Sequence, residues 1–410
     1  MPQTQEHMEI IDLYGIKRGI VALTKADLVD PEWLELVQAD ISERLSATSL
    51  AGAPIVPVSA VTGLNLDVLQ AAIDDMLGTL AREEPGDDPL LWVDRVFTIK
   101  GAGTVVTGTL VGGCLQTGMD VVVQPAGLKA RIRGLQNHTK TVEQGMPHSR
   151  LAVNLTGLEK ADLARGMYLS LPGRRRHYTL INASVQVLAG APAPLSTGQT
   201  VKLYVGTLET LAKVKILGSD ELAPGTEGLV QLQLELPAHF SFQDRFILRH
   251  SELQENLGGG TFIEEGIPVR GKNLRLVGPE RLRHLFPFEK PEARLDLESL
   301  KAKCEADPLS YSLLKAEDRT YWTLQQFRQE GLQRHPKLKD FGEFVLAPKQ
   351  FDKVRAFLLD TVAAFHAANP LSPGPSKETL RTATGLPARL FDQVLREIPE
   401  LQEVRGCLCA

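Results

Sequence analysis

Two short polar motifs follow apolar runs near the N-terminus of this sequence. They comprise Thr24, Lys25 and Asp27 in the first, and Ser59, Ala60 and Val61 in the second. The apolar runs before them, 19–23 and 55–58, have the length and composition of buried parallel strands, and helical patterns at 31–45 and 65–80 alternate with them. Ligands of open α/β sheets bind outside the carboxyl ends of the strands. We therefore expect the two motifs to lie together at one ligand-binding edge.

The first motif, Thr-Lys-Ala-Asp, resembles the Asn/Thr-Lys-x-Asp sequence with which GTPases select guanine. Guanine presents two donors on one edge, which the Asp27 carboxylate can accept and adenine cannot offer; each buried polar group left unpaired would cost about 1–3 kcal/mol. The Lys25 stem can cover the purine face. Thr24 stands where Asn is commoner, and a backbone N–H of the 59–61 loop would meet guanine O6. The alternative is a solvated turn, in which Lys and Asp after a strand are also common.

The phosphate-binding sequence G-x-x-x-x-G-K-[S/T] does not occur in the 410 residues. In GTP-binding domains that loop supplies the amide cradle for the phosphates and the Ser or Thr that binds Mg²⁺. The motifs therefore indicate the base-reading half of a GTP site, and we expect the chain to be a fragment that begins midway through a GTPase domain. We assign no catalytic residue and no metal ligand, and the use of GTP with Mg²⁺ stays open.

The stretch 94–110, DRVFTIKGAGTVVTGTL, predicts a β-hairpin. Threonine and valine favour strands on both sides, and Gly101 and Gly103 suit a tight turn. A Gly-x-Gly sequence can also cradle phosphate, but that needs a helix after the loop, and here a strand follows. Further β runs with glycine turns predict two antiparallel β-barrels. The first takes the runs at 91–100, 104–112, 120–124, 130–136, 150–155 and 167–170, and the second those at 179–188, 199–205, 208–217, 228–236 and 244–250.

From residue 293 onward the pattern becomes helical. Helices are expected around 295–304, 320–327, 348–367 and 387–397, another is expected to begin with its cap at 376–379, and short strands are expected at 344–346 and 401–405. Short helices followed by a β wing are typical of winged-helix modules, relatives of the helix-turn-helix. The sequence ends after what we expect to be the first strand of a second wing. Plain helical packing is the alternative interpretation.

The fold class is thus multidomain, with a partial α/β P-loop GTPase domain, two antiparallel β-barrels and C-terminal α+β winged-helix modules. The expected parts are the C-terminal half of the GTPase domain at 1–84, the first β-barrel at 85–173, the second at 174–279, a winged-helix module at 280–350 and a second, truncated one at 351–410. Linkers are expected at 81–88 and 279–291. The basic run 174–177 is expected to be a solvated face or an RNA contact.

The run FTIKGAGTVVTGTLVGGCLQTGMDVVV resembles the start of the second domain of translational GTPases related to elongation factor Tu. Elongation factor Tu itself ends after its second barrel, whereas the order with winged helices resembles the bacterial selenocysteine-specific elongation factors. MPQTQEHMEIIDLYGIKRGIVALTKADLVD, GLQNHTK and HSRLAVNLTGLE resemble the same family. This resemblance implies GTP-dependent delivery of selenocysteinyl-tRNA to the ribosome at recoded stop codons. In that family, winged helices nearest the C-terminus bind a messenger RNA hairpin, and those modules are not expected in this sequence.

The same resemblance implies a pocket for the selenocysteinyl group on the first barrel. Asp94 and Arg95, ahead of the hairpin, and Arg150, in HSRLAVNL, match the family's pocket positions. A selenol is anionic near neutral pH, whereas a serine hydroxyl is neutral, so guanidinium groups can distinguish two side chains that differ little in shape. The alternative is that Arg95 and Arg150 only pair with Asp94 at the surface.

Composition limits the remaining possibilities. The net charge of −5 excludes a uniformly basic nucleic-acid-binding protein, so any RNA contact must use local patches. No apolar run is long enough to span a membrane, and four scattered cysteines suggest the reducing cytoplasm rather than a disulfide framework or a metal site. Two other functions stay open. One is another GTPase of the superfamily, such as the sulfate adenylyltransferase subunit; the other is a non-hydrolysing tRNA- or RNA-binding protein built from barrels and winged helices.

Overall fold

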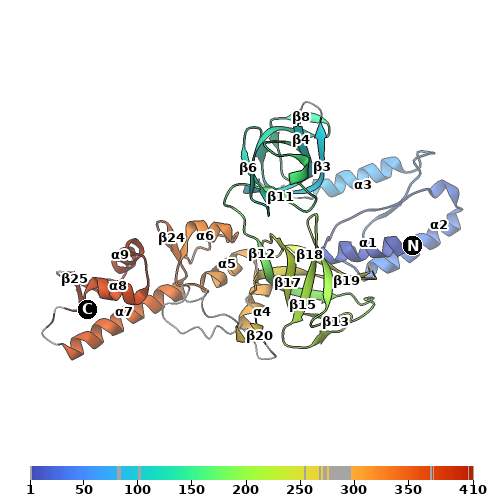
Figure 1. Ribbon diagram of the computed structural model, residues 1–410. Helices are drawn as coiled ribbons and strands as arrows, with labels where there is room; N and C mark the ends of the chain where they lie inside the picture. The colour runs from blue at the N-terminus through green and yellow to red at the C-terminus, as the bar shows by residue number, and fades with distance from the viewer. Residues whose placement is uncertain are drawn as a thin grey trace. The chain divides into compact units, whose positions relative to one another are not determined.

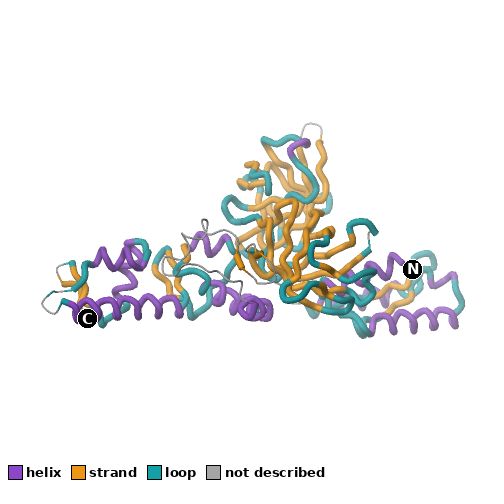
Figure 2. The backbone as a smooth tube through the Cα atoms, turned by 60° about the horizontal axis from the view of Figure 1, so that its bottom comes forward, coloured by secondary structure: helices purple, strands orange, loops and turns teal. Residues whose placement is uncertain are grey.

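The computed structural model describes most of the chain (Figure 1). The described residues are 2–80, 85–99, 103–253, 255–266, 269–270, 275–276, 297–369, 372, 374–404 and 406–409. Close contacts group them into two compact units, the first within 1–171, 185–228 and 245–261, and the second within 172–184, 229–244 and 262–410. The second barrel contributes strands to both units. Strands dominate the middle of the chain and helices dominate its two ends (Figure 2).

The N-terminal part confirms the expected alternation of strands and helices. Its elements are α1 (Pro2–Leu13), β1 (Val21–Leu23), α2 (Pro31–Ser46), β2 (Ile55–Pro57) and α3 (Leu66–Gly78). β1 and β2 pair in parallel with Leu23 opposite Pro57, so their carboxyl ends lie side by side. The start of α2 follows from sequence, because the Asp30 carboxylate accepts a hydrogen bond from the Trp33 N–H at 2.8 Å and proline occupies the first helical position. This arrangement brings the two polar motifs to one edge.

The first barrel has six strands that close on themselves. They are β3 (Asp87–Ile99), β4 (Gly103–Gly113), β6 (Asp120–Gln124), β7 (Leu128–Asn137), β10 (Ser149–Thr156) and β11 (Tyr168–Ser170). Their order is β10-β4-β3-β11-β6-β7, and β7 pairs again with β10. The expected hairpin is confirmed as the antiparallel pair β3–β4, while its turn, 100–102, lies outside the described residues. Alternate residues of β10, Leu151, Val153 and Leu155, are buried, whereas Ala152 and Asn154 between them are only partly buried, as expected of a strand with one face in the core.

The second barrel is also closed, and one of its strands was not expected. Its order is β12 (Tyr178–Val187), β17 (Glu227–Ala238), β15 (Leu208–Ile216), β14 (Thr200–Val205), β18 (Arg245–His250) and β19 (Asn256–Glu265). The sequence does not predict β19, because three consecutive glycines, 258–260, are unfavourable for a strand. Gly258 has a steric reason: a Cβ at this position would lie 2.2 Å from the backbone oxygen of Gln186. The glycine therefore permits close packing of neighbouring backbones.

The C-terminal part contains two helical groups, each followed by a small antiparallel sheet. The first group is α4 (Leu297–Glu305), α5 (Pro308–Ala316), β22 (Trp322–Thr323), α6 (Leu324–Gln329), β23 (Lys339–Phe341) and β24 (Phe344–Leu346). The second is α7 (Pro348–Ala368), α8 (Lys377–Thr384), α9 (Ala388–Arg396), β25 (Gln402–Val404) and β26 (Cys407–Cys409). These groups confirm the winged-helix architecture.

Three details of the C-terminal part differ from expectation or fall outside the description. Helix α5 was not expected. The second wing was expected to stop after one strand, but β25 pairs antiparallel with β26, so both strands of that hairpin are present. The predicted linker at 279–291 and part of the one at 81–88 lie outside the described residues.

Candidate functional site

The two polar motifs near the N-terminus are joined by hydrogen bonds that continue the pairing of β1 with β2. The Val58 N–H donates to the Leu23 carbonyl at 2.8 Å, and the Ala26 N–H donates to the Val58 carbonyl at 3.1 Å. Ala26 is also buried, which holds the first motif against the second. The structure therefore brings together the motifs that the sequence predicted to meet.

Lys25 and Asp27 present their charged groups to solvent beside this joint. Lys25 has a left-handed backbone, with φ of 64°, and Asp27 lies in the short 3₁₀ turn η1 (Ala26–Leu28) that follows. Both side chains are exposed, as is Thr24, and within the described part of the chain neither Lys25 nor Asp27 makes a side-chain hydrogen bond or ion pair. A carboxylate and an ammonium placed in this way can both meet a ligand. The uncommon backbone at Lys25 is consistent with a functional position.

The Ser59 side chain supports the loop that its own motif forms. Its side chain is buried, and its Oγ accepts hydrogen bonds from the N–H groups of Val61 at 3.3 Å and Thr62 at 3.2 Å. The hydroxyl therefore holds the loop in shape rather than facing a ligand. Among the described residues the Ala60 N–H has no acceptor, which leaves it available to a carbonyl oxygen such as guanine O6.

Asn65, which was not among the site residues expected from the sequence, also supports this loop. Its Nδ2 donates to the Pro57 carbonyl at 2.9 Å, and its backbone is left-handed, with φ of 53°. The available signal was an Asn immediately before a helix, a position that Asn favours. Asn65 thus ties the start of α3 to the end of β2.

Replacing Ser59 with alanine should loosen the loop. The substitution removes the acceptor of two N–H groups, and each lost hydrogen bond contributes about 0.5–1.5 kcal/mol. We expect faster amide hydrogen exchange at 59–63 and a several-fold weaker affinity for guanosine, measured by exchange mass spectrometry and by NMR titration. Val61→Ala is the matched control, because the Val61 side chain is 89% exposed. Equal effects of the two substitutions would contradict this role of Ser59.

On the first barrel, Asp94 occupies a β-bulge. The pairing of β3 with β4 shifts from Val93 opposite Gly108 to Arg95 opposite Thr107, so Asp94 is the extra residue. Bulges redirect side chains, and here the carboxylate contacts two other strands. Its Oδ2 lies 2.5 Å from Arg150 Nη2, and its Oδ1 accepts a hydrogen bond from Thr107 Oγ1 at 2.5 Å. The structure thus joins Asp94 and Arg150, which are far apart in sequence.

Arg95 is placed differently from Arg150. Its side chain is exposed and makes no hydrogen bond or ion pair with any described residue. The Asp94 side chain is only 19% exposed and that of Arg150 52%, so their ion pair is partly shielded. The alternative that both arginines only pair with Asp94 at the surface therefore describes Arg150 but not Arg95. Arg95 offers a guanidinium that is not already neutralised.

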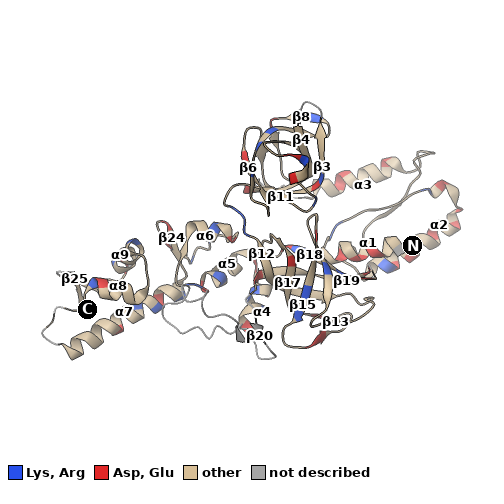
Figure 3. Ribbon diagram, in the orientation of Figure 1, with Lys and Arg blue, Asp and Glu red and all other residues tan. Residues whose placement is uncertain are grey.

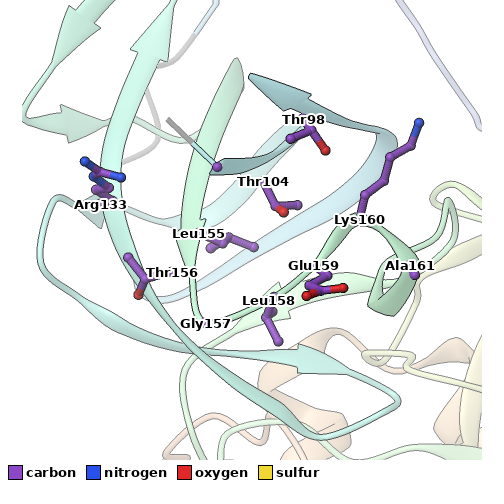
Figure 4. A pocket seen from close by; sticks show the side chains of 11 residues that line it. Thr98, Thr104, Arg133, Leu155, Thr156, Gly157, Leu158, Glu159, Lys160 and Ala161 are labelled. Atoms are coloured by element: carbon purple, nitrogen blue, oxygen red, sulfur yellow. The ribbon is translucent and has the colours of Figure 1, made fainter. Parts of the chain in front are cut away.

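A separate open cavity of about 630 Å³ lies on the first barrel. Figure 4 shows its lining, with Thr98 and Thr104 from the β3–β4 hairpin and the Arg133 and Lys160 side chains on different sides. Asp94, Arg95 and Arg150 are not among its lining residues. The cavity therefore does not coincide with the candidate aminoacyl site.

The basic run at 174–177 is largely engaged inside the second compact unit. Arg175 Nη1 lies 2.8 Å from His239 Nε2, and Arg176 pairs with Glu330 and, at 3.2 Å, with Glu265. Burial, together with the neighbouring Arg175, lowers the pKa of His239 to about 3. These contacts favour a structural role for Arg175 and Arg176 over RNA contact.

Charges of both signs also mix on the second helical group (Figure 3). Lys377 of α8 pairs with Asp392 at 2.8 Å and with Glu403 at 2.7 Å, and Arg381 pairs with Glu378.

Within the described ranges, no helix is long and apolar enough to cross a membrane. The same ranges hold no cluster of three His, Cys, Asp or Glu side chains suited to a metal ion.

Three family models match the chain. The elongation factor Tu GTP binding domain matches residues 1–79, the beta-barrel domain of selenocysteine-specific elongation factor matches 182–268, and the winged helix of elongation factor SelB matches 359–400. Together these matches follow the order of parts expected from the sequence.

Curated relatives are named selenocysteine-specific elongation factor. The protein of Desulfomicrobium baculatum is 41% identical over 263 residues, which cover 64% of this chain and 42% of that protein. The protein of Escherichia coli (strain K12) is 28% identical over 386 residues, covering 93% of this chain and 58% of that protein. The chain thus spans about half the length of these relatives.

Solved structures show the same fold. A bacterial selenocysteine-specific elongation factor, EF-Sec, is similar with a TM-score of 0.75 and 22% identity, over 100% of this chain and 64% of that one. Apo elongation factor SelB from Methanococcus maripaludis is similar with a TM-score of 0.59 and 26% identity, over 67% of this chain and 64% of that one. Sequence relatives, family models and fold agree: the chain belongs to the selenocysteine-specific elongation factors, a family of GTPases related to elongation factor Tu.

Proposed function

We propose that this chain takes part in the GTP-dependent delivery of selenocysteinyl-tRNA to the ribosome at recoded stop codons. The observation that carries the proposal is the cluster of Asp94, Arg95 and Arg150 on the first barrel. Arg95 supplies a guanidinium with no hydrogen bond or ion pair to any described residue, and Arg150 supplies a second, which the Asp94 carboxylate holds. Such a cluster suits a ligand that presents one negative charge at the end of a short side chain.

Charge is the property by which this cluster would select its ligand. A selenolate can accept charge-assisted hydrogen bonds from Arg95 and Arg150, and bonds of this kind contribute about 1.5–3 kcal/mol. A serine hydroxyl is neutral and gains little from a guanidinium. Selenocysteine and serine are close in size, so charge can discriminate where shape cannot.

The candidate nucleotide site has residues that can bind the guanine base but none that we assign to the phosphates. Asp27 would accept from N1–H and the N2 amino group, Lys25 would cover the base, and the Ala60 N–H would donate to O6. GTP would supply the family's conformational switch, with Mg²⁺ at its phosphates. Since the 410 residues hold no G-x-x-x-x-G-K-[S/T] sequence, we assign neither the phosphates nor Mg²⁺ to residues of this chain.

We expect weak guanine-nucleotide binding and no measurable GTP hydrolysis by the chain itself. Base contacts remain, but phosphate contacts carry much of the affinity of complete GTP sites. Asp27→Asn should remove the preference for guanosine over adenosine, measured by NMR titration of both nucleosides. Hydrolysis well above a buffer blank, abolished by Asp27→Asn, would contradict this assignment.

A second candidate function is a tRNA- or RNA-binding protein that does not use nucleotide. The two helical groups with β wings favour it. The ribosome and the messenger RNA hairpin are partners that the family suggests. The ion pairs of α8 give no basic face there for RNA.

Binding to three forms of the same tRNA tests the proposal against this alternative. We expect the chain to bind selenocysteinyl-tRNA under reducing conditions more tightly than seryl-tRNA, and seryl-tRNA about as weakly as uncharged tRNA. Fluorescence anisotropy of labelled tRNA measures all three. Equal affinities would favour the general RNA-binding function and contradict the aminoacyl pocket.

A further inference from the structure

Thr107 connects to the candidate aminoacyl site through Asp94. It lies on β4, 13 residues after Asp94, and its Oγ1 donates to Asp94 Oδ1 at 2.5 Å. The other carboxylate oxygen, Oδ2, lies 2.5 Å from Arg150 Nη2 on β10. A single carboxylate therefore joins the hydroxyl of one strand to the guanidinium of another.

The strand register explains why these three side chains meet. Along β4, Val106 and Leu110 are fully buried in the barrel core, whereas Thr107 and Thr109 belong to the opposite, outward face. Arg150 of β10 pairs with Thr109 of β4, which places it two pairs away from Thr107, on the same face of the sheet. The bulge at Asp94 then completes the contact from β3.

We propose that Thr107 is a positioning residue of the aminoacyl site, acting through Asp94 on Arg150; this inference rests on the proposed function. The hydroxyl occupies one oxygen of the carboxylate and thereby fixes its rotation. The second oxygen then holds one edge of the Arg150 guanidinium. Arginine has five donors, so the edge that Asp94 does not occupy stays available for an anionic ligand.

Thr107 aids binding by ordering the Arg150 side chain rather than by contacting the ligand. The Arg150 side chain is half exposed, and without a partner it would sample many rotamers. Ordering it before the ligand arrives reduces the entropy that binding must overcome. Thr107 therefore affects only ligands that use Arg150, which means the anionic selenocysteinyl group and not the neutral seryl group.

Thr107→Val tests this role, because valine keeps the shape and removes the hydroxyl. We expect selenocysteinyl-tRNA affinity to fall about three- to tenfold, with seryl-tRNA affinity unchanged. Thr107→Ser keeps a hydroxyl and should retain most of the affinity. Thr109→Val is the matched control on the same outward face, since the Thr109 side chain makes no hydrogen bond with any described residue.

A double-mutant cycle shows whether Thr107 acts through Asp94. In an Asp94→Ala background, Thr107→Val should have no further effect on selenocysteinyl-tRNA affinity. Additive losses in the double mutant would overturn the inference, and so would equal losses for both charged tRNAs. It would also be overturned if Thr107→Val left the affinity for selenocysteinyl-tRNA unchanged while Arg150→Ala weakened it. A wild-type chain that binds both charged tRNAs equally would instead overturn the proposed function. Thermal unfolding of each variant separates these outcomes from loss of the fold.

Discussion

Replacing Glu264 with glutamine should lower the free energy of unfolding by about 3–5 kcal/mol, because it leaves buried lysines without a full set of counter-ions. Glu264, at the end of β19, has its Oε2 3.0 Å from Lys303 Nζ of α4 and 2.6 Å from Lys315 Nζ of α5. Both lysines also pair with Asp318, at 2.9 and 3.1 Å. Two cations and two anions thus form a closed, largely buried network between a barrel strand and the first helical group.

The same network gives the direction of the pH dependence. Burial alone would raise the pKa of Glu264, but Lys315 and Lys303 outweigh that effect and lower it to about 2. A carboxyl whose folded pKa lies below its unfolded value of 4.5 stabilises the fold above that pH. The contribution should therefore be lost as the pH falls from 4.5 towards 2, and Glu264→Gln should lack this part of the acid sensitivity.

Denaturant unfolding of Glu264→Gln beside Asp340→Asn measures the effect. Asp340 pairs with Arg334 at 3.0 Å, but both side chains are more than half exposed, so its loss should cost under about 1 kcal/mol. Equal destabilisation by the two substitutions would show that the buried network contributes no more than a surface pair.

Arg150→Ala should weaken binding of selenocysteinyl-tRNA by about ten- to a hundredfold and leave seryl-tRNA binding nearly unchanged. The reason is that only the anionic ligand gains from a guanidinium in a partly shielded site. We expect Arg95→Ala to act similarly, because Arg95 has no internal counter-ion among the described residues. Asp94→Ala should have a smaller effect, through the orientation of Arg150.

Salt provides an independent check on these two arginines. Higher ionic strength should weaken contacts with the tRNA backbone for both charged tRNAs, yet preserve most of the ratio of their affinities, because shielded pairs are screened less. Arg131→Ala is a suitable control, since its ion pair with Asp120 is long, at 3.8 Å, and exposed. Equal losses for the two charged tRNAs in Arg150→Ala would mean that Arg150 contacts tRNA phosphate.

Local pattern predicted most of the fold because the strands bury one face in a barrel. The alternation of Leu232, Gln233 and Leu234 could be read directly, and the burial of both leucines beside an exposed Gln233 confirms it. Strand β19 could not, because glycines chosen for close backbone approach at Gly258 weaken the strand signal. Helix α5 did carry a signal that was overlooked: Asp307 caps it, accepting from the Leu309 and Ser310 N–H groups at 2.9 and 3.1 Å, and proline follows directly.

The candidate site was predictable where it depends on neighbours in sequence. Thr24, Lys25 and Asp27 follow one strand directly, so the position of that strand places them. The contact of Asp94 with Thr107 and Arg150 depends instead on a one-residue shift in strand register, which no local pattern reveals. The inward role of Ser59 was equally hidden, because a hydroxyl suits a ligand and a turn alike.

The central claim is that the first barrel reads the charge of the esterified amino acid, and a pH titration with cysteinyl-tRNA tests it most directly. Cysteine matches selenocysteine in shape, but its thiol has a pKa of about 8.5 and is mostly neutral near pH 7. With stable amide-linked analogues, we predict that the chain binds cysteinyl-tRNA weakly at about pH 7. The affinity should rise towards that of selenocysteinyl-tRNA at about pH 9.5, where the thiol is ionised, and Arg150→Ala should remove most of this rise. Equal affinities for both ligands at about pH 7, or a cysteinyl-tRNA affinity that does not change with pH, would contradict the account.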